Sequence, residues 1–89
     1  MAAENIPVQM ISVCETDGVM KPIRFRFEDE DNLLRTVSVK EVVNRTETNF
    51  IGIKMISFVC VTQHDGQEHM IELRYAVTEH KWCLFRTIY

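Results

Sequence analysis

Apolar and polar residues alternate along most of this chain, and no window of about 11 residues or more has a helical period. In the run PIRFRFE, Ile23, Phe25 and Phe27 point to one side of an extended chain, and Arg24 and Arg26 point to the other. A period of two is that of a β-strand with one buried face. The alternation therefore predicts an all-β protein.

Turn residues divide the alternating runs. Asp17-Gly18 and Asp65-Gly66 each lie between two strand patterns, and Asp-Gly suits the positive φ angles of a type I′ hairpin turn. Six strands are expected, at about residues 8–15, 21–28, 34–44, 53–63, 68–77 and 82–88.

The third expected strand loses its period at Val42-Val43, which predicts a bulge or a sharp bend. The segment from Thr46 to Gly52 follows it, and it is the longest irregular connection that the sequence predicts.

The separation of apolar from charged residues selects one register for the fourth and fifth strands. A two-residue turn at Asp65-Gly66 opposes Cys60 to Ile71 and Phe58 to Leu73. A three-residue loop would instead place Glu72 opposite Phe58, so the two-residue turn is expected.

The second and third strands are aligned in the same way. A loop of Glu30, Asp31 and Asn32 opposes Phe25 to Val37 and Ile23 to Val39, and Asn32 takes the left-handed position that such loops need. A four-residue loop would oppose two arginines, which disfavours it.

The 89 residues amount to one domain, spanning residues 1–89. A short all-β chain must curl to cover its own inner face. The sequence therefore predicts a six-stranded antiparallel meander curled into a small, SH3-like barrel.

Composition disfavours several classes of protein. The net charge of -3 argues against a dedicated nucleic-acid binder, which usually carries a strongly basic face. No apolar run approaches the roughly 18 residues of a membrane span, so no membrane partner is expected. The N-terminal run MAAENIPVQM lacks the basic and apolar regions of a signal peptide. The 3 cysteines are widely spaced, which predicts reduced thiols and a cytoplasmic location.

Cys60, His64 and His69 lie close together in the run CVTQHDGQEHMIEL and face one side of the expected hairpin. A zinc site needs four ligands, or three and a water, and no fourth ligand is evident. Cys60 lies deeper in the hairpin, where a free cysteine behaves as a small apolar residue. A cysteine nucleophile would also need a pocket and an oxyanion hole, and nothing supplies them. The sequence therefore predicts no catalytic residue, no metal site and no cofactor.

A small basic surface is expected on the outward side of the second and third strands. It consists of Arg24, Arg26 and Lys40, with Thr36 and Ser38 between them. Small barrels bind nucleic acid through such faces, with aromatic rings that stack on bases beside the charges. The nearest rings here point inward, so this face is expected to be a solvated surface. A nucleic-acid-associated accessory domain is the alternative function.

The run KPIRFRFEDEDNLLRTVSVKEVVNRTE resembles the opening of a group of short bacterial β-rich domains of unknown function. In these domains a PxxFxW/F strand is followed, after a polar turn, by a VxxVxxR strand. The matching residues are Pro22, Phe25 and Phe27, the last in place of the usual Trp, and then Val39, Val42 and Arg45. The closing run KWCLFRTIY is similar to their Trp-containing final strand. Some of these domains stand beside or within DNA-repair polymerase-like proteins, and no catalytic residue carries over from them.

The outward face of the fourth and fifth strands carries a surplus of apolar side chains. They are Met55, Val59, Val61, Met70 and Ala76, and the last strand adds Cys83 and Phe85 with a two-residue turn, or Trp82, Leu84 and Ile88 with a three-residue one. A contiguous apolar patch of this kind is unusual for a monomer. Either the segment from Thr46 to Gly52 or the N-terminal segment folds over it, or another protein packs there.

The expected function is therefore that of a non-enzymatic binding module. Its ligand is a protein partner, or a second copy of the chain in a symmetric homodimer, with Val59, Val61 and Met70 at the interface.

Overall fold

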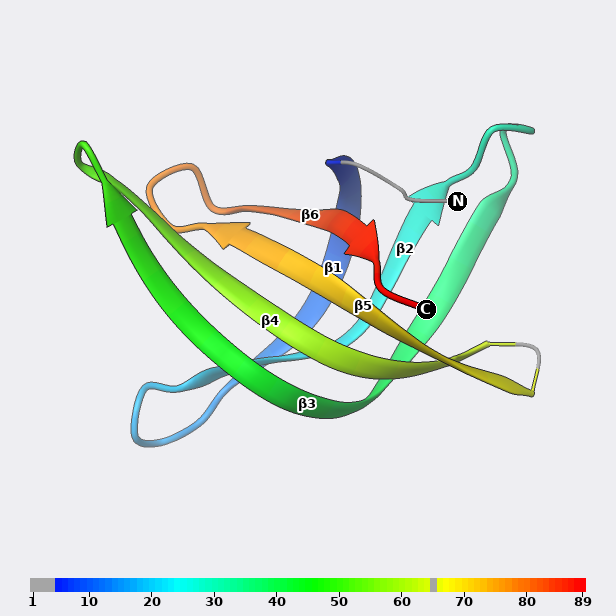
Figure 1. The fold of residues 1–89 in the computed structure, drawn as a ribbon, viewed down its shortest axis with the longest axis horizontal. Coiled ribbons are helices and arrows are strands. Elements are labelled where there is room, and N and C mark those ends of the chain that lie inside the picture. Colours follow the sequence, from blue (N-terminus) through cyan, green and yellow to red (C-terminus); the bar gives the residue numbers. More distant parts are fainter. Residues whose placement is uncertain (1–4, 65) are drawn as a thin grey trace.

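The computed structural model describes residues 5–64 and 66–89, apart from the side chain of Phe50. Its strands are β1 (Ile6–Cys14), β2 (Met20–Glu28), β3 (Leu34–Phe50), β4 (Ile53–His64), β5 (Gln67–Ala76) and β6 (Lys81–Thr87). Each strand pairs antiparallel with the next, and β1 also pairs with β6, so that the sheet closes into a barrel (Figure 1). The predicted all-β barrel is confirmed, and an SH3-like barrel is compatible with it. None of the described residues forms a helix that could cross a membrane.

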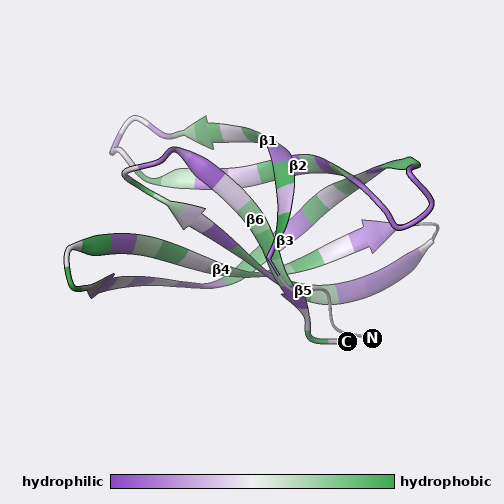
Figure 2. Ribbon diagram, turned by 90° about the horizontal axis from the view of Figure 1, so that it is seen from above, coloured by the Kyte–Doolittle hydropathy of each residue, from purple (hydrophilic) through white to green (hydrophobic). Residues whose placement is uncertain are grey.

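The inward sides of the strands form one apolar core. The side chains of Phe58, Leu73 and Cys60 have almost no exposed surface. Along the strands, hydrophobic and hydrophilic residues alternate in bands (Figure 2), as the period of two requires. The buried core consists of Phe25, Val37, Ile56, Phe58, Cys60, Ile71, Leu73 and Leu84.

The predicted register of β4 and β5 is confirmed. Cys60 opposes Ile71 and Phe58 opposes Leu73. His64 pairs with Gln67, which leaves a two-residue connection. Gly66 has the positive φ expected of it, and Asp65 lies outside the described residues.

The predicted register of β2 and β3 is also confirmed for its central pair, in which Phe25 opposes Val37. The backbone N–H of Asp29 donates to the carbonyl of Leu33 at 2.9 Å, which closes a three-residue loop. Asn32 has the left-handed φ of 61° that the loop needs.

Ile23 was expected to point inward toward Val39, and this prediction is wrong. Ile11 pairs with Arg24 and Ser12 pairs with Pro22, so Ile23 is an extra residue in β2 with no partner in β1. Ile23 is 43% exposed, whereas Pro22 is fully buried. Pro22 and Ile23 are both apolar, so the hydropathy pattern does not show which of the two is buried when such a bulge is present.

β3 is longer than predicted. It has 17 residues and continues to Phe50, so the irregular connection expected from Thr46 to Gly52 is wrong. Only Ile51 and Gly52 form the turn, with φ angles of 50° and 76° that suit a two-residue hairpin. Residues 44–49 of this strand are exposed and polar on both sides, so no alternation of hydropathy marks them.

The predicted bulge in β3 is confirmed, and a second bulge accompanies it. Lys40 and Val43 are each an extra residue relative to β4. β2 pairs with β3 only as far as Arg24 and Ser38. From Val39 onward, no strand among the described residues pairs with β3 on this side.

Two turns differ from the sequence prediction. The first hairpin has a three-residue loop in which the Gly18 N–H donates to the Glu15 carbonyl at 2.8 Å. Gly18 has a φ of 90°, but Asp17 is not left-handed, so a type I′ turn is excluded there. The last hairpin has four residues between Ala76 and Lys81, rather than two or three.

Replacing Gly66 with alanine is expected to lower the free energy of unfolding by about 1 kcal/mol, because alanine resists a positive φ. Gly66 has a φ of 75°, and a Cβ placed on it meets no atom within 4 Å, so the cost is conformational rather than steric. Urea unfolding measures the loss. Gly66→Asn is the control, since asparagine tolerates this φ better. An alanine variant as stable as the parent would contradict the prediction.

Candidate functional site

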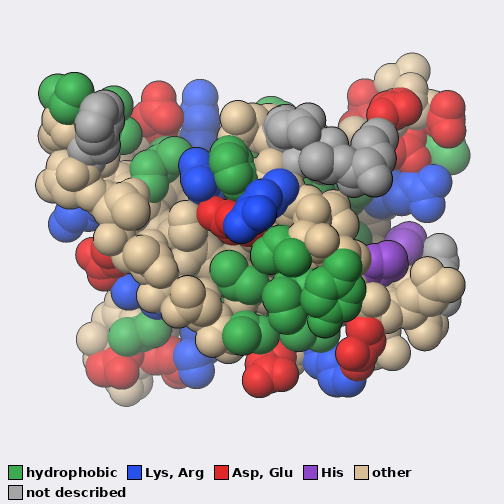
Figure 3. Space-filling model, viewed as in Figure 1, with side chains coloured by type: hydrophobic (Ala, Val, Ile, Leu, Met, Phe, Trp, Pro, Cys, Tyr) green, Lys and Arg blue, Asp and Glu red, His purple; other side chains and the backbone are tan. Residues whose placement is uncertain are grey.

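The first candidate surface is the outward side of the last three strands, which we name the β4–β6 face. It presents half-buried apolar side chains from all three strands: Met55, Val59, Val61, Met70, Ala76, Cys83 and Phe85. In Figure 3, hydrophobic side chains gather on this side of the molecule, next to a group of acidic and basic ones.

The charged group at the centre of this face is built around Glu72. Its side chain is only 9% exposed, and it opposes Val59 across the strand pair. Its Oε2 accepts a hydrogen bond from Arg74 Nε at 3.1 Å, and its Oε1 accepts one from Arg86 Nε at 2.8 Å. The Arg74 guanidinium also lies over the Phe85 ring, 3.4 Å from its centroid. Each arginine is thereby held in place while its other N–H groups stay unused by Glu72.

Two opposing influences act on the Glu72 carboxyl. Burial favours its neutral form, but the hydrogen bonds and charges of Arg86 and Arg74 outweigh this and hold the pKa below the ordinary value of 4.5. Glu72 is therefore ionised at neutral pH. The group of one carboxylate and two guanidiniums carries a net positive charge.

β6 presents the outward residues that were expected for a two-residue turn, although the turn itself has four residues. A four-residue turn has the same parity as the two-residue one, so Cys83 and Phe85 face outward. Trp82 and Leu84 face the core instead, and the Trp82 ring lies 5.3 Å from that of Phe58.

The segment from Thr46 to Gly52 does not cover the β4–β6 face, whereas Asn5 of the N-terminal segment lies at its edge, where its Oδ1 accepts a hydrogen bond from Cys83 Sγ at 3.7 Å. Residues 46–50 belong to β3, and residues 6–14 form β1, which is a wall of the barrel. Residues 1–4 lie outside the described residues.

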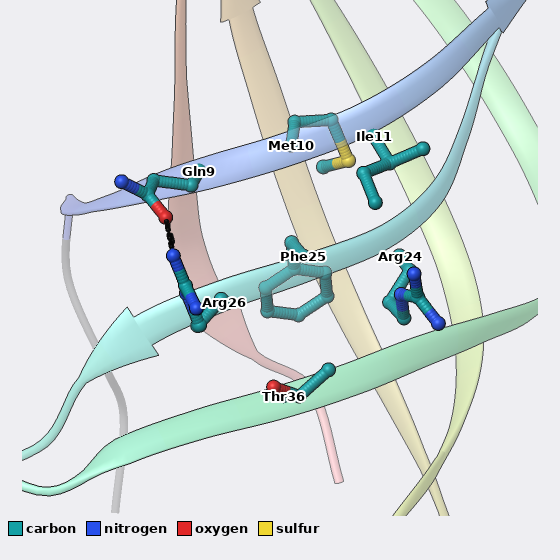
Figure 4. Close-up of a pocket in the computed structure, with 7 residues that line it drawn as sticks. All are labelled: Gln9, Met10, Ile11, Arg24, Phe25, Arg26 and Thr36. Atoms are coloured by element: carbon teal, nitrogen blue, oxygen red, sulfur yellow. Dashed lines mark hydrogen bonds between the residues drawn. The ribbon is translucent and has the colours of Figure 1, made fainter.

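The second candidate surface is a groove of about 470 Å³ across β1, β2 and β3 (Figure 4). It is lined by Gln9, Met10, Ile11, Arg24, Phe25, Arg26 and Thr36, none of which is acidic. The side-chain oxygen of Gln9 accepts hydrogen bonds from Arg26 at 2.6 and 3.1 Å and fixes that guanidinium. Arg24 forms no hydrogen bond or ion pair with any other described residue. The groove therefore offers positive charge to an anion.

Lys40 does not join the two arginines. It is an extra residue in β3, beyond the last pair between β2 and β3, and its ammonium group forms an ion pair with Glu68 of β5. The structure thus brings Arg24 and Arg26 together and places Lys40 in a neutralised pair elsewhere.

The three residues once considered for a metal have different surroundings. Cys60 is fully buried in the core, whereas His64 and His69 are half-buried and line a depression on the surface. Within residues 5–64 and 66–89, no three His, Cys, Asp or Glu side chains are grouped so that they could hold a metal ion.

Cys60 is expected to resist alkylation in the folded protein, because burial raises the pKa of its thiol to about 12 and only the thiolate reacts. Cys14 is the internal control and should react readily, because it is exposed. Mass spectrometry after iodoacetamide treatment, with and without denaturant, distinguishes them. Labelling of both thiols at equal rates in the native protein would contradict this.

The sequence did not reveal the Glu72 group. Glu72 and Arg74 alternate with apolar residues on β5, which was the available signal, but Arg86 reaches Glu72 only through a register shift between β5 and β6.

Comparison with known proteins does not identify a relative: no protein-family model, curated protein or solved structure matches the chain. The resemblance to short bacterial β-rich domains remains a prediction.

Proposed function

We propose that this protein is a non-enzymatic binding module that docks a protein partner on its β4–β6 face. The observation that carries the proposal is the construction of this face, in which half-buried apolar side chains surround the ordered group of Glu72, Arg74 and Arg86. Protein interfaces commonly combine an apolar centre with arginines that are held in place before binding.

The charge of this group favours a particular kind of partner. Both oxygens of Glu72 accept a hydrogen bond from an arginine Nε, and each arginine has further N–H donors besides this one. A second copy placed symmetrically on this face would bring two positive groups together, which costs binding energy. The proposed partner therefore presents a carboxylate among apolar side chains.

The test compares proteins captured from the native host by three baits. Val61→Lys with Met70→Glu places an ion pair on the β4–β6 face without changing the sheet. Arg24→Glu with Arg26→Glu alters the groove instead and serves as the matched control. A specific partner should be captured by the parent and the groove variant and lost with the face variant. Loss with the groove variant alone would contradict the proposal.

Direct binding completes this test. The captured partner, once purified, should bind the parent at least tenfold more tightly than Arg86→Glu, because that change places a carboxylate opposite the partner's own. NMR shift changes should fall on β4, β5 and β6. Equal affinity of the two proteins would exclude the acidic partner, and shifts confined to β2 and β3 would exclude this face.

A second function, binding of single-stranded nucleic acid, is supported by the groove between Arg24 and Arg26, whose described lining holds no acidic side chain. Phosphate contacts weaken with salt, so binding should fall between about 50 and 200 mM salt and with Arg24→Glu plus Arg26→Glu. The nearest ring in the groove, Phe25, is 2% exposed and cannot stack on a base. NMR titration with an oligonucleotide tests this, and unchanged β2 and β3 signals would remove the second function.

A further inference from the structure

The end of β3 is an open edge of the sheet, and the stretches of β1 and β2 that pair only with each other are further open edges. β2 leaves β3 after Ser38 and pairs with β1, so β3 has β4 on one side and no strand of the described residues on the other. Bulges at Lys40 and Val43 interrupt the first part of this edge. From Asn44 to Asn49 the pairing with β4 is regular, and every one of these side chains is exposed.

An exposed edge of this kind can pair with another strand through its unpaired backbone groups. We propose that the segment Asn44–Thr48, which we name the β3 edge, pairs antiparallel with the same segment of a second copy around a two-fold axis at Thr46. This is a different surface from the β4–β6 face and does not depend on the function proposed for it.

The order of side chains on the β3 edge selects both the partner and the register. Arg45 and Glu47 lie on the inward side, and Arg45 Nη1 is 2.9 Å from Glu47 Oε2 within one chain. With the axis at Thr46, Arg45 of each copy opposes Glu47 of the other, and the two Thr46 residues oppose one another. Opposite charges and paired threonines are both favourable in directly opposed positions.

Other symmetric registers lose this match. An axis at Arg45 opposes two arginines, and an axis at Glu47 opposes two glutamates, both of which are unfavourable. Inward charges usually protect an edge from pairing with other strands. Here Arg45 and Glu47 disfavour pairing with most other strands but form opposite-charge pairs with a second copy of the chain. A symmetric interface needs such self-complementarity.

The test measures mass by sedimentation equilibrium from micromolar to millimolar protein. The parent should show a monomer–dimer equilibrium, and Arg45→Glu or Glu47→Arg alone should each weaken it by roughly tenfold or more, because like charges then oppose one another twice. An equimolar mixture of these two variants should form a mixed dimer, and the double variant Arg45→Glu with Glu47→Arg should dimerise again.

The mixture separates loss of pairing from damage to the fold, since a misfolded chain is not rescued by another variant. Val61→Lys with Met70→Glu, which alters the β4–β6 face, should leave the dimer intact. A parent that stays monomeric at all concentrations, or a dimer that the single charge changes do not affect, would overturn the inference. So would two single variants that fail to associate when mixed.

Discussion

Replacing Phe58 with alanine is expected to lower the free energy of unfolding by about 3–5 kcal/mol, which is a large part of the 5–15 kcal/mol of a typical domain. The Phe58 side chain is 1% exposed and opposes Leu73 at the centre of the core. Its ring also packs against that of Trp82 at 5.3 Å. Truncation removes these contacts and leaves a cavity that the rigid strands cannot close.

Urea unfolding of the two proteins measures this loss. Leu34→Ala is the control, because Leu34 is 65% exposed and should change stability by no more than about 0.5 kcal/mol. A loss of less than about 1 kcal/mol in the Phe58 variant would mean that this ring does not occupy the core.

Replacing Glu72 with glutamine is expected to cost about 1–3 kcal/mol at neutral pH, because two arginines lose a buried carboxylate. It should also flatten the fall of stability in acid. The folded pKa of Glu72 lies below its ordinary value of 4.5, so its stabilisation is complete above that value and is lost as the pH falls through the folded pKa.

Unfolding by urea, repeated from neutral pH downward, gives both quantities. Glu68→Gln is the matched control, since Glu68 pairs with Lys40 on the surface and both side chains are more than half exposed. Such a pair contributes little, so this variant should follow the parent's curve. Parallel acid curves for the parent and Glu72→Gln would show that Glu72 is not held ionised by the fold.

The parts of the fold that could be predicted are those in which buried and exposed positions differ clearly in hydropathy or charge. In the β4–β5 hairpin the alternative register would have placed Glu72 opposite Phe58, so hydropathy alone selected the pairing. The alignment of Phe25 with Val37 rests on charge instead, because the alternative loop would have opposed two arginines. Each prediction therefore rests on a clear cost of misplacing a charged side chain.

The parts that could not be predicted are those in which hydropathy does not distinguish the two sides of a strand, or in which a bulge changes the side that is buried. Residues 44–49 of β3 are polar on both sides of the strand, so their composition resembled that of a loop. A bulge exposes Ile23 and buries Pro22, and because both residues are apolar their hydropathy does not distinguish the two arrangements.

For the candidate surfaces too, residues that share one strand could be placed from the sequence, whereas contacts between strands could not. Arg24 and Arg26 are two positions apart on one strand, which suffices to place them on one side. Lys40 was assigned to them by counting along β3, and its bulge breaks that count. The contact of Arg86 with Glu72 joins two strands across a register shift, which no local pattern records.

The two bulges in β3 bear on how this chain can vary in length. Lys40 lies between Val39 and Glu41, and Glu41 already opposes Val61, so a protein that lacks Lys40 keeps Val39 inward and Glu41 outward. Removing Val43 likewise leaves every other residue of β3 on its present side. At other positions in β3, deletion of one residue would move the side chains that follow it to the opposite side of the sheet. Shorter or longer versions of this protein should therefore differ at these two positions, and with them in the curvature of β3.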